Sequence, residues 1–88
     1  MTSHTTTGFR GMFARLPGDV QQHARDAYRA FLRDPFHPSL RFKRLNSGDE
    51  LWSVRVGLHY RAVGVRDGAA IVWFWIGTHA EYDRLTAR

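Results

Sequence analysis

The basic side chains are concentrated in the middle of the chain. Six of the 13 Lys and Arg residues fall between residues 41 and 66, where only two acidic side chains offset them. They are Arg41, Lys43, Arg44, Arg55, Arg61 and Arg66. The segments before and after this stretch are close to neutral. This distribution predicts a surface that faces a polyanion, and the alternative is an ordinary solvated surface rich in arginine.

Side chains suited to proton transfer lie near the C-terminus. Histidine exchanges protons near neutral pH, and His79 stands three residues before Tyr82, on the same side of any helix that forms there. Glu81 and Asp83 offer carboxylates, but their spacing singles out neither. His59 is a second histidine that could share this work.

Several classes of site and setting are excluded or disfavoured. The chain has no cysteine, which excludes a disulfide framework and a thiolate metal site. Its five histidines show no metal-ligand spacing, and no Gly-rich phosphate loop or Ser-His-Asp arrangement is visible. We therefore expect no metal and no small-molecule cofactor. No apolar run approaches the roughly 20 residues of a membrane span, and the polar N-terminus lacks a signal-peptide pattern, so we expect a cytoplasmic protein without membrane contact.

The 88 residues of the chain are expected to form one domain, 1–88. The first half of the sequence has helical periodicity. Apolar side chains recur on one helical face at Val20, Ala24, Ala27, Tyr28, Phe31 and Leu32. Asp19 is a candidate N-cap, unless Pro17 lies in the first turn, and Pro35 ends the helix. A shorter helix is expected near residues 9–16.

The second half predicts consecutive strands. Strand-like runs cover 40–45, 52–56, 60–66 and 69–77, with a turn at 46–49 and a hairpin at Asp67-Gly68. Arg55 lies on the polar face of 52–56, opposite to Trp52, Val54 and Val56. Thr78 and Glu81 have the spacing of a capping box for a short final helix. The class is α+β, with helices packed on one face of a small antiparallel meander.

These segments, in this order, resemble a known family. They read L-W-S-V-R-V (51–56), H-Y-R-A-V-G-V-R-D-G (59–68) and I-V-W-F-W-I-G-T-H-A-E-Y-D-R-L (71–85), after L-P-G-D-V-Q-Q-H-A-R-D-A-Y-R-A-F (16–31) and H-P-S-L-R-F-K-R-L (37–45). Together they resemble the RelE/ParE toxin superfamily, in the branch of RelE- and HigB-like toxins of type II toxin–antitoxin systems. The resemblance covers roughly residues 9–86. The family usually begins with a hydrophobic strand, whereas residues 4–7 are polar here, so that strand is expected to be short, frayed or absent.

The resemblance implies partners and activities. It implies a RelE-like fold, a cognate antitoxin, and cleavage of messenger RNA in the ribosomal A site. The antitoxin is expected to lay an acidic or amphipathic segment over the basic groove. Two other functions stay open: poisoning of DNA gyrase, as in the ParE branch, and an inactive relic that only binds antitoxin. The fold alone does not choose between them.

The resemblance also implies site residues. Cleavage by a 2′-hydroxyl needs a base, an acid and cations around the pentacoordinate phosphorus, with no metal required. Arg61 matches the family's sheet arginine, which would hold the scissile phosphate, with Arg55 as a second ligand. His79 would transfer a proton, and Tyr82 would stack on a base or touch the phosphate, unless it is a core aromatic. The RNA-binding residues would be Arg41, Lys43 and Arg44.

Overall fold

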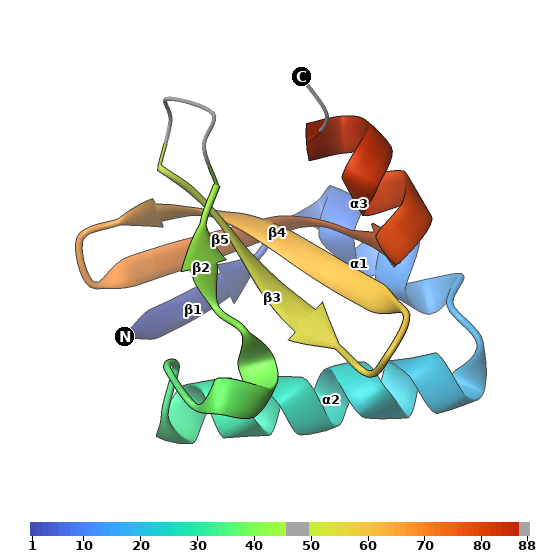
Figure 1. Cartoon of the computed structure of the whole chain (residues 1–88), viewed down its shortest axis with the longest axis horizontal. Coiled ribbons are helices and arrows are strands. Elements are labelled where there is room, and N and C mark those ends of the chain that lie inside the picture. Colours follow the sequence, from blue (N-terminus) through green and yellow to red (C-terminus); the bar gives the residue numbers. More distant parts are fainter. Residues whose placement is uncertain (46–49, 87–88) are drawn as a thin grey trace.

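A five-stranded sheet in the order β1-β5-β4-β3-β2 forms the centre of the molecule (Figure 1). The computed structural model describes residues 1–45 and 50–86, so the turn predicted at 46–49 lies outside the described residues. The strands are β1 (Thr2–Thr5), β2 (Lys43–Arg44), β3 (Leu51–Val56), β4 (Tyr60–Asp67) and β5 (Ala70–Thr78). The helices are α1 (Thr7–Ala14), α2 (Gly18–Arg33), the 3-10 turn η1 (Pro38–Leu40) and α3 (His79–Thr86). The predicted α+β class is confirmed.

Strands β2 to β5 form the predicted antiparallel meander, and β1 adds a parallel edge strand beside β5. This strand is short, as expected from the polar N-terminus, but all four of its residues pair with β5. Threonine suits strand geometry, and the indole Nε1 of Trp73 donates a 2.9 Å hydrogen bond to Ser3 Oγ. With β1 in place, β5 has a neighbour on each side, which explains its run of apolar residues.

Helix α2 follows the predicted periodicity with two differences. It begins at Gly18 with Pro17 as N-cap and no side-chain cap, so Asp19 lies in the first turn and the predicted Asp19 cap is wrong. The helix ends at Arg33, since the residue before Pro35 adopts an extended conformation. Val20 and Phe31 are buried, whereas Leu32 is 54% exposed at the edge of the apolar face.

The hydrophobic core lies between the sheet and helices α1 and α2. Phe31 of α2 packs edge-on against Phe42 and Trp73, with ring centroids 5.1 and 5.5 Å apart. Around these rings lie the buried sheet side chains Val54, Val56, Ala62, Ile71 and Ile76. Trp73 is therefore a core residue. The two N-terminal helices cover one sheet face and leave the other to α3.

Two glycines shape the β4–β5 hairpin. Its two-residue loop is Gly68-Ala69, one position later than predicted, because Asp67 still pairs with Ala70. Gly68 has φ +59, which glycine adopts without strain. The second glycine, Gly64, lies on β4 at a register shift, and a Cβ there would lie 2.9 Å from both the Trp73 ring and the Val72 carbonyl.

None of the helices in the described residues has the length and apolarity needed to cross a membrane.

Candidate functional site

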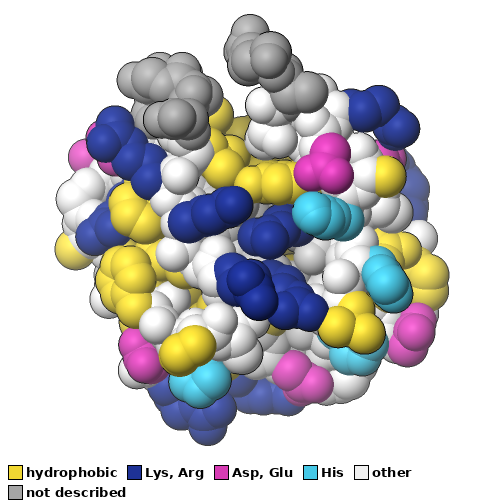
Figure 2. Space-filling model, in the orientation of Figure 1, with side chains coloured by type: hydrophobic (Ala, Val, Ile, Leu, Met, Phe, Trp, Pro, Cys, Tyr) yellow, Lys and Arg dark blue, Asp and Glu magenta, His cyan; other side chains and the backbone are white. Residues whose placement is uncertain are grey.

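Four of the predicted site residues meet at one small hollow on the sheet face that α1 and α2 leave open. It has a volume of about 210 Å³ and is called the basic hollow below. Its lining residues are Arg41, Arg55, Leu58, Tyr60, Arg61 and His79. Lys and Arg side chains gather over the middle strands on this face, with histidines beside them (Figure 2). Residues up to 38 positions apart in the sequence thus converge at one place.

Arg55 and Arg61 are directly opposite each other in the β3–β4 ladder. Side chains in such a pair point to the same face, with Cβ atoms about 4.5–5.5 Å apart, and like charges there are destabilising. No acidic side chain is among the described residues that line the hollow. Arg55 is held by a 3.0 Å hydrogen bond from its Nε to the Gly57 carbonyl. An anion would relieve the repulsion, so the site is suited to one.

Tyr82 lies beneath the hollow rather than on its surface. It is only 5% exposed, and its hydroxyl is 3.1 Å from the hydroxyl of the fully buried Ser53. The guanidinium carbon of Arg61 lies 5.2 Å from the centre of the Tyr82 ring. The structure therefore favours the alternative that the sequence left open, an aromatic that closes the domain. Stacking of Tyr82 on a nucleobase would require its burial to be undone.

His79 is fixed at the start of α3. Its backbone N–H donates a 2.7 Å hydrogen bond to the His59 carbonyl, which ties the helix to the β3–β4 turn. The His79 side chain is 47% exposed, and its Nδ1 lies 3.8 Å from an Asp83 carboxylate oxygen. The imidazole is thus accessible from the hollow and has a carboxylate one helical turn away.

The predicted capping box at the start of α3 is confirmed. Glu81 accepts hydrogen bonds from the Thr78 N–H (2.9 Å) and the Thr78 hydroxyl (3.0 Å), and the Glu81 N–H donates to the Thr78 hydroxyl (3.1 Å). The hydrogen bond from the Thr78 backbone N–H lowers the pKa of Glu81 most, and the bond from the Thr78 hydroxyl lowers it further. Because its carboxylate is engaged in the cap, Glu81 is a poor choice for a base.

Lys43 and Arg44 do not line the basic hollow. Lys43 is opposite Ser53, so it shares the sheet face of Arg55 and Arg61. Arg44 is opposite Trp52 on the other face and forms a 3.1 Å ion pair with Glu50. The predicted cluster is therefore split, with Lys43 on the sheet face of the hollow and Arg44 on the other face.

Arg41 reaches the hollow through a left-handed backbone conformation, with φ +47. This conformation is uncommon for residues other than glycine and costs on the order of 1 kcal/mol. Its neighbours Leu40 and Phe42 are both buried in the core. Arg41 is the exposed residue between these two buried ones. Sequence patterns gave no sign of this strain, nor of Leu58 and Tyr60 in the lining.

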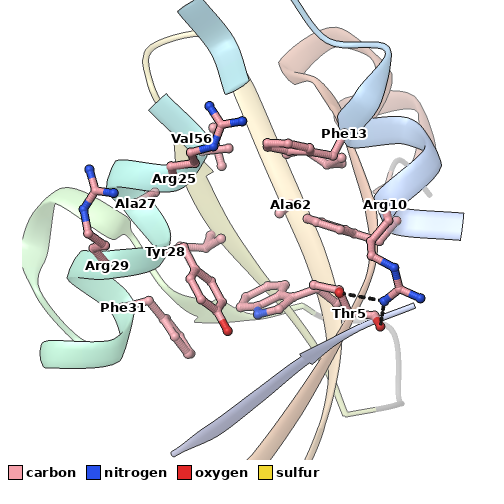
Figure 3. A pocket seen from close by; sticks show the side chains of 15 residues that line it. Thr5, Arg10, Phe13, Arg25, Ala27, Tyr28, Arg29, Phe31, Val56 and Ala62 are labelled. Atoms are coloured by element: carbon pink, nitrogen blue, oxygen red, sulfur yellow. Dashed lines mark hydrogen bonds between the residues drawn. The ribbon is translucent and has the colours of Figure 1, made fainter. Parts of the chain in front are cut away.

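A second concavity lies on the opposite side of the sheet, between α1 and α2 (Figure 3). This helix cleft has a volume of about 510 Å³ and is floored by core side chains, including Phe31, Val54 and Trp73. Arg10, Arg25 and Arg29 also belong to its lining. Arg29 is paired with Asp26, whereas Arg25 lies over the Phe13 ring and Arg10 donates to the Thr5 carbonyl. The cleft is thus apolar with basic residues beside it.

Comparison with known proteins identifies the family. The family model described as a ParE-like toxin domain matches residues 18–84. The chain belongs to this toxin family. No curated protein matches the sequence. This ParE-like toxin is accordingly a member of the RelE/ParE superfamily of type II toxin–antitoxin systems, as its motifs predicted.

Three solved structures illustrate the likeness of this toxin to others. The YoeB/ParE toxin from Agrobacterium tumefaciens has a TM-score of 0.70 and 19% identity, covering 90% of this chain and 99% of that one. The RelB-RelE antitoxin–toxin complex from Methanococcus jannaschii has a TM-score of 0.73 and 16% identity, covering 92% of this chain and 96% of that one. The toxin–antitoxin complex RelBE2 from Mycobacterium tuberculosis has a TM-score of 0.71 and 22% identity, covering 89% of this chain and 96% of that one. At these identities the likeness establishes the RelE-like fold, which was the expected one.

Proposed function

We propose that this toxin is a metal-independent endoribonuclease that cuts messenger RNA on the ribosome. The observation that carries the proposal is the direct opposition of Arg55 and Arg61 in a hollow without a described acidic lining residue. Two guanidinium groups on one sheet face fit the oxygens of a single phosphodiester. A third arginine, Arg41, and the proton-exchanging side chain of His79 line the same hollow.

The proposed reaction uses the side chains at these positions. The 2′-oxygen of the RNA attacks the phosphorus, the bond from phosphorus to the 5′-oxygen breaks, and a cyclic phosphate and a free 5′-hydroxyl form. Arg55 and Arg61 bind the phosphate oxygens and stabilise the extra negative charge of the pentacoordinate state. His79 exchanges a proton with the reacting oxygens, which histidine does efficiently near neutral pH. Lys43, on the same face, binds the backbone of a flanking nucleotide.

The test is a translation reaction on purified ribosomes with a defined message, in which 5′ ends are mapped by primer extension. Cuts at A-site codons that require both the ribosome and Arg61 would support the proposal. Arg15→Ala is the matched control, because Arg15 is an exposed arginine outside the basic hollow. An intact message with the unchanged protein would contradict it.

The second candidate function is poisoning of DNA gyrase without enzymatic chemistry. It is favoured by one observation, namely that the matching family model is a ParE-like one. In that case the basic face contacts gyrase or its DNA. Inhibition of DNA supercoiling by purified toxin, with no cut in any message, would select this function. Antitoxin binding without growth arrest would instead indicate an inactive relic.

We also propose that the antitoxin anchors an amphipathic segment in the helix cleft, and not only over the basic groove that the family resemblance implies. Two solved relatives are complexes of toxin and antitoxin. The cleft joins an apolar floor to Arg10 and Arg25, and no ion pair with an acid is found for either of them in the described part of the chain. Such a surface is complementary to bulky apolar side chains flanked by Asp or Glu.

A further inference from the structure

The Tyr82 ring contacts two of the side chains to which the proposed function gives direct roles. The Arg61 guanidinium carbon lies 5.2 Å from the ring centre, and the His79 ring centre lies 5.9 Å away at a 49° tilt. Arg61 and His79 line the basic hollow, whereas Tyr82 does not. One buried ring therefore underlies two groups that reach the hollow from different elements, β4 and α3.

Ser53 is the hydrogen-bond partner of the Tyr82 hydroxyl. It is the one polar side chain that is buried within the described residues, with no exposed surface. A buried hydroxyl is destabilising unless it is hydrogen-bonded, and its partner is the Tyr82 hydroxyl at 3.1 Å. Ser53 is two residues before Arg55 on β3, so it is on the same sheet face as the hollow. The bond links the C-terminal helix to the strand that carries Arg55.

The Arg61 guanidinium has little else to hold it. Its Nη1 is buried and has no hydrogen-bond partner, and none of the ion pairs in residues 1–45 and 50–86 involves Arg61. A carboxylate at this position would orient the group but would also cancel the charge that binds a phosphate. An aromatic face attracts a guanidinium and leaves its net charge intact. The ring is thus a support suited to an arginine that must bind an anion.

We propose that Ser53 and Tyr82 are positioning residues, which hold Arg61 in place for phosphate binding and His79 in place for proton transfer without touching the RNA. The proposal rests on the proposed function and adds to it a buried pair. The competing explanation is that Tyr82 only packs α3 against the sheet. The two explanations differ in whether Tyr82 acts through Arg61.

The test measures affinity for a short single-stranded RNA as a function of salt. We expect Tyr82→Leu to weaken binding about tenfold, as for loss of a desolvated cation–π contact, and to make the salt dependence shallower by about 0.7 in log–log slope, as for one lost phosphate contact. In an Arg61→Ala background, the same substitution is expected to have no further effect. An equal loss in both backgrounds, or no loss in a folded Tyr82→Leu variant, would overturn the proposal.

Milder variants keep the test decisive if Tyr82→Leu does not fold. Tyr82→Phe keeps the ring and removes its hydroxyl, and Ser53→Ala removes the partner hydroxyl. Each is expected to weaken RNA binding about threefold, and the double variant is expected to be no weaker than either single one, because both remove the same bond. Additive losses, or no loss in either, would contradict the role of Ser53. Tyr28→Leu, at a tyrosine 40% exposed on α2, is the control.

An NMR measurement separates this proposal from the proposed function. The Tyr82 ring current should displace the Arg61 Nε–H resonance in the unchanged protein, and the displacement should disappear in folded Tyr82→Leu. If the toxin binds no RNA but the resonance behaves in this way, the endoribonuclease proposal fails and the positioning role stands. A resonance that does not respond to Tyr82→Leu overturns the positioning role, whatever the toxin binds.

Discussion

Arg55 and Arg61 lie directly opposite each other across β3 and β4, two like charges on one sheet face. This arrangement disfavours the folded state in the absence of an anion. We therefore predict that inorganic phosphate raises the melting temperature of the toxin at constant ionic strength, since a ligand that binds only the folded state stabilises it. Arg61→Ala should remove most of this rise and Arg15→Ala should not. An equal response of all three proteins in thermal unfolding would rule out an anion site here.

His79 is expected to act in the chemical step rather than in binding. His79→Ala should lower the cleavage rate on ribosomes about 10²- to 10⁴-fold, the usual contribution of a positioned acid or base. The affinity for RNA should change by less than about threefold, since the arginines of the hollow remain. Single-turnover kinetics separate the two quantities. Asp83→Asn, which alters the carboxylate 3.8 Å from His79 Nδ1, is the milder companion variant, and full activity of His79→Ala would exclude the assignment.

The sequence predicted those parts of the fold that local patterns encode. The period of α2 predicted the burial of Val20 and Phe31, and the spacing of Thr78 and Glu81 predicted the cap of α3. These features depend on residues at most a few helical turns apart. The parallel pairing of β1 with β5 was not predicted, because it joins segments about 68 residues apart and the polar residues of β1 carry no hydrophobic alternation.

The site was predicted in part. The structure brings Arg61, Arg55, His79 and Arg41 to one hollow, and their roles there stay predictions. Tyr82 is an amphipathic side chain, so its position in a helix did not decide between surface and core. Ser53 stands between Trp52 and Val54 in the sequence, which puts it on the polar face of the strand with Arg55, and nothing in these neighbours indicates full burial. The helix cleft was not predicted for a similar reason, because the residues of its floor have the same periodicity as those of an ordinary hydrophobic core.

The cap of α3 should make stability depend on pH. Hydrogen bonds from Thr78 lower the pKa of Glu81 in the folded state. The ionised Glu81 therefore contributes to stability at pH values above 4.5, the ordinary pKa that it has in the unfolded chain. The contribution is lost as the pH falls through the lower, folded value. Glu81→Gln should therefore make the loss of stability in acid smaller. Denaturant unfolding at pH values from about 3 to about 7, a range that includes the usual carboxyl pKa, measures this loss. An unchanged slope would show that the cap is not linked to protonation.

The helix cleft predicts a variant that escapes its antitoxin. Arg25→Glu places a negative charge beside the apolar floor, and it should weaken antitoxin binding by about tenfold or more through like-charge repulsion. Cleavage on ribosomes should be unchanged, because Arg25 is in the lining of the cleft and not of the basic hollow. Arg15→Glu makes the same charge change outside the cleft and serves as control. Calorimetric titration with the cognate antitoxin would count against the cleft if both variants bound equally.

Phe31 is expected to be a main source of stability. It is 2% exposed and packs edge-on against Phe42 and Trp73, so Phe31→Ala removes a large apolar side chain and two aromatic contacts. Such truncations cost about 3–5 kcal/mol, a large share of the roughly 5–15 kcal/mol by which a domain of this kind is stable. We expect the lower end of that range, because Phe31 also lines the helix cleft and its neighbours can relax into that space. Leu32→Ala is the matched control, since Leu32 is next in sequence and 54% exposed; it should cost less than about 1 kcal/mol. Equal losses in urea unfolding would show that the core is not built around Phe31.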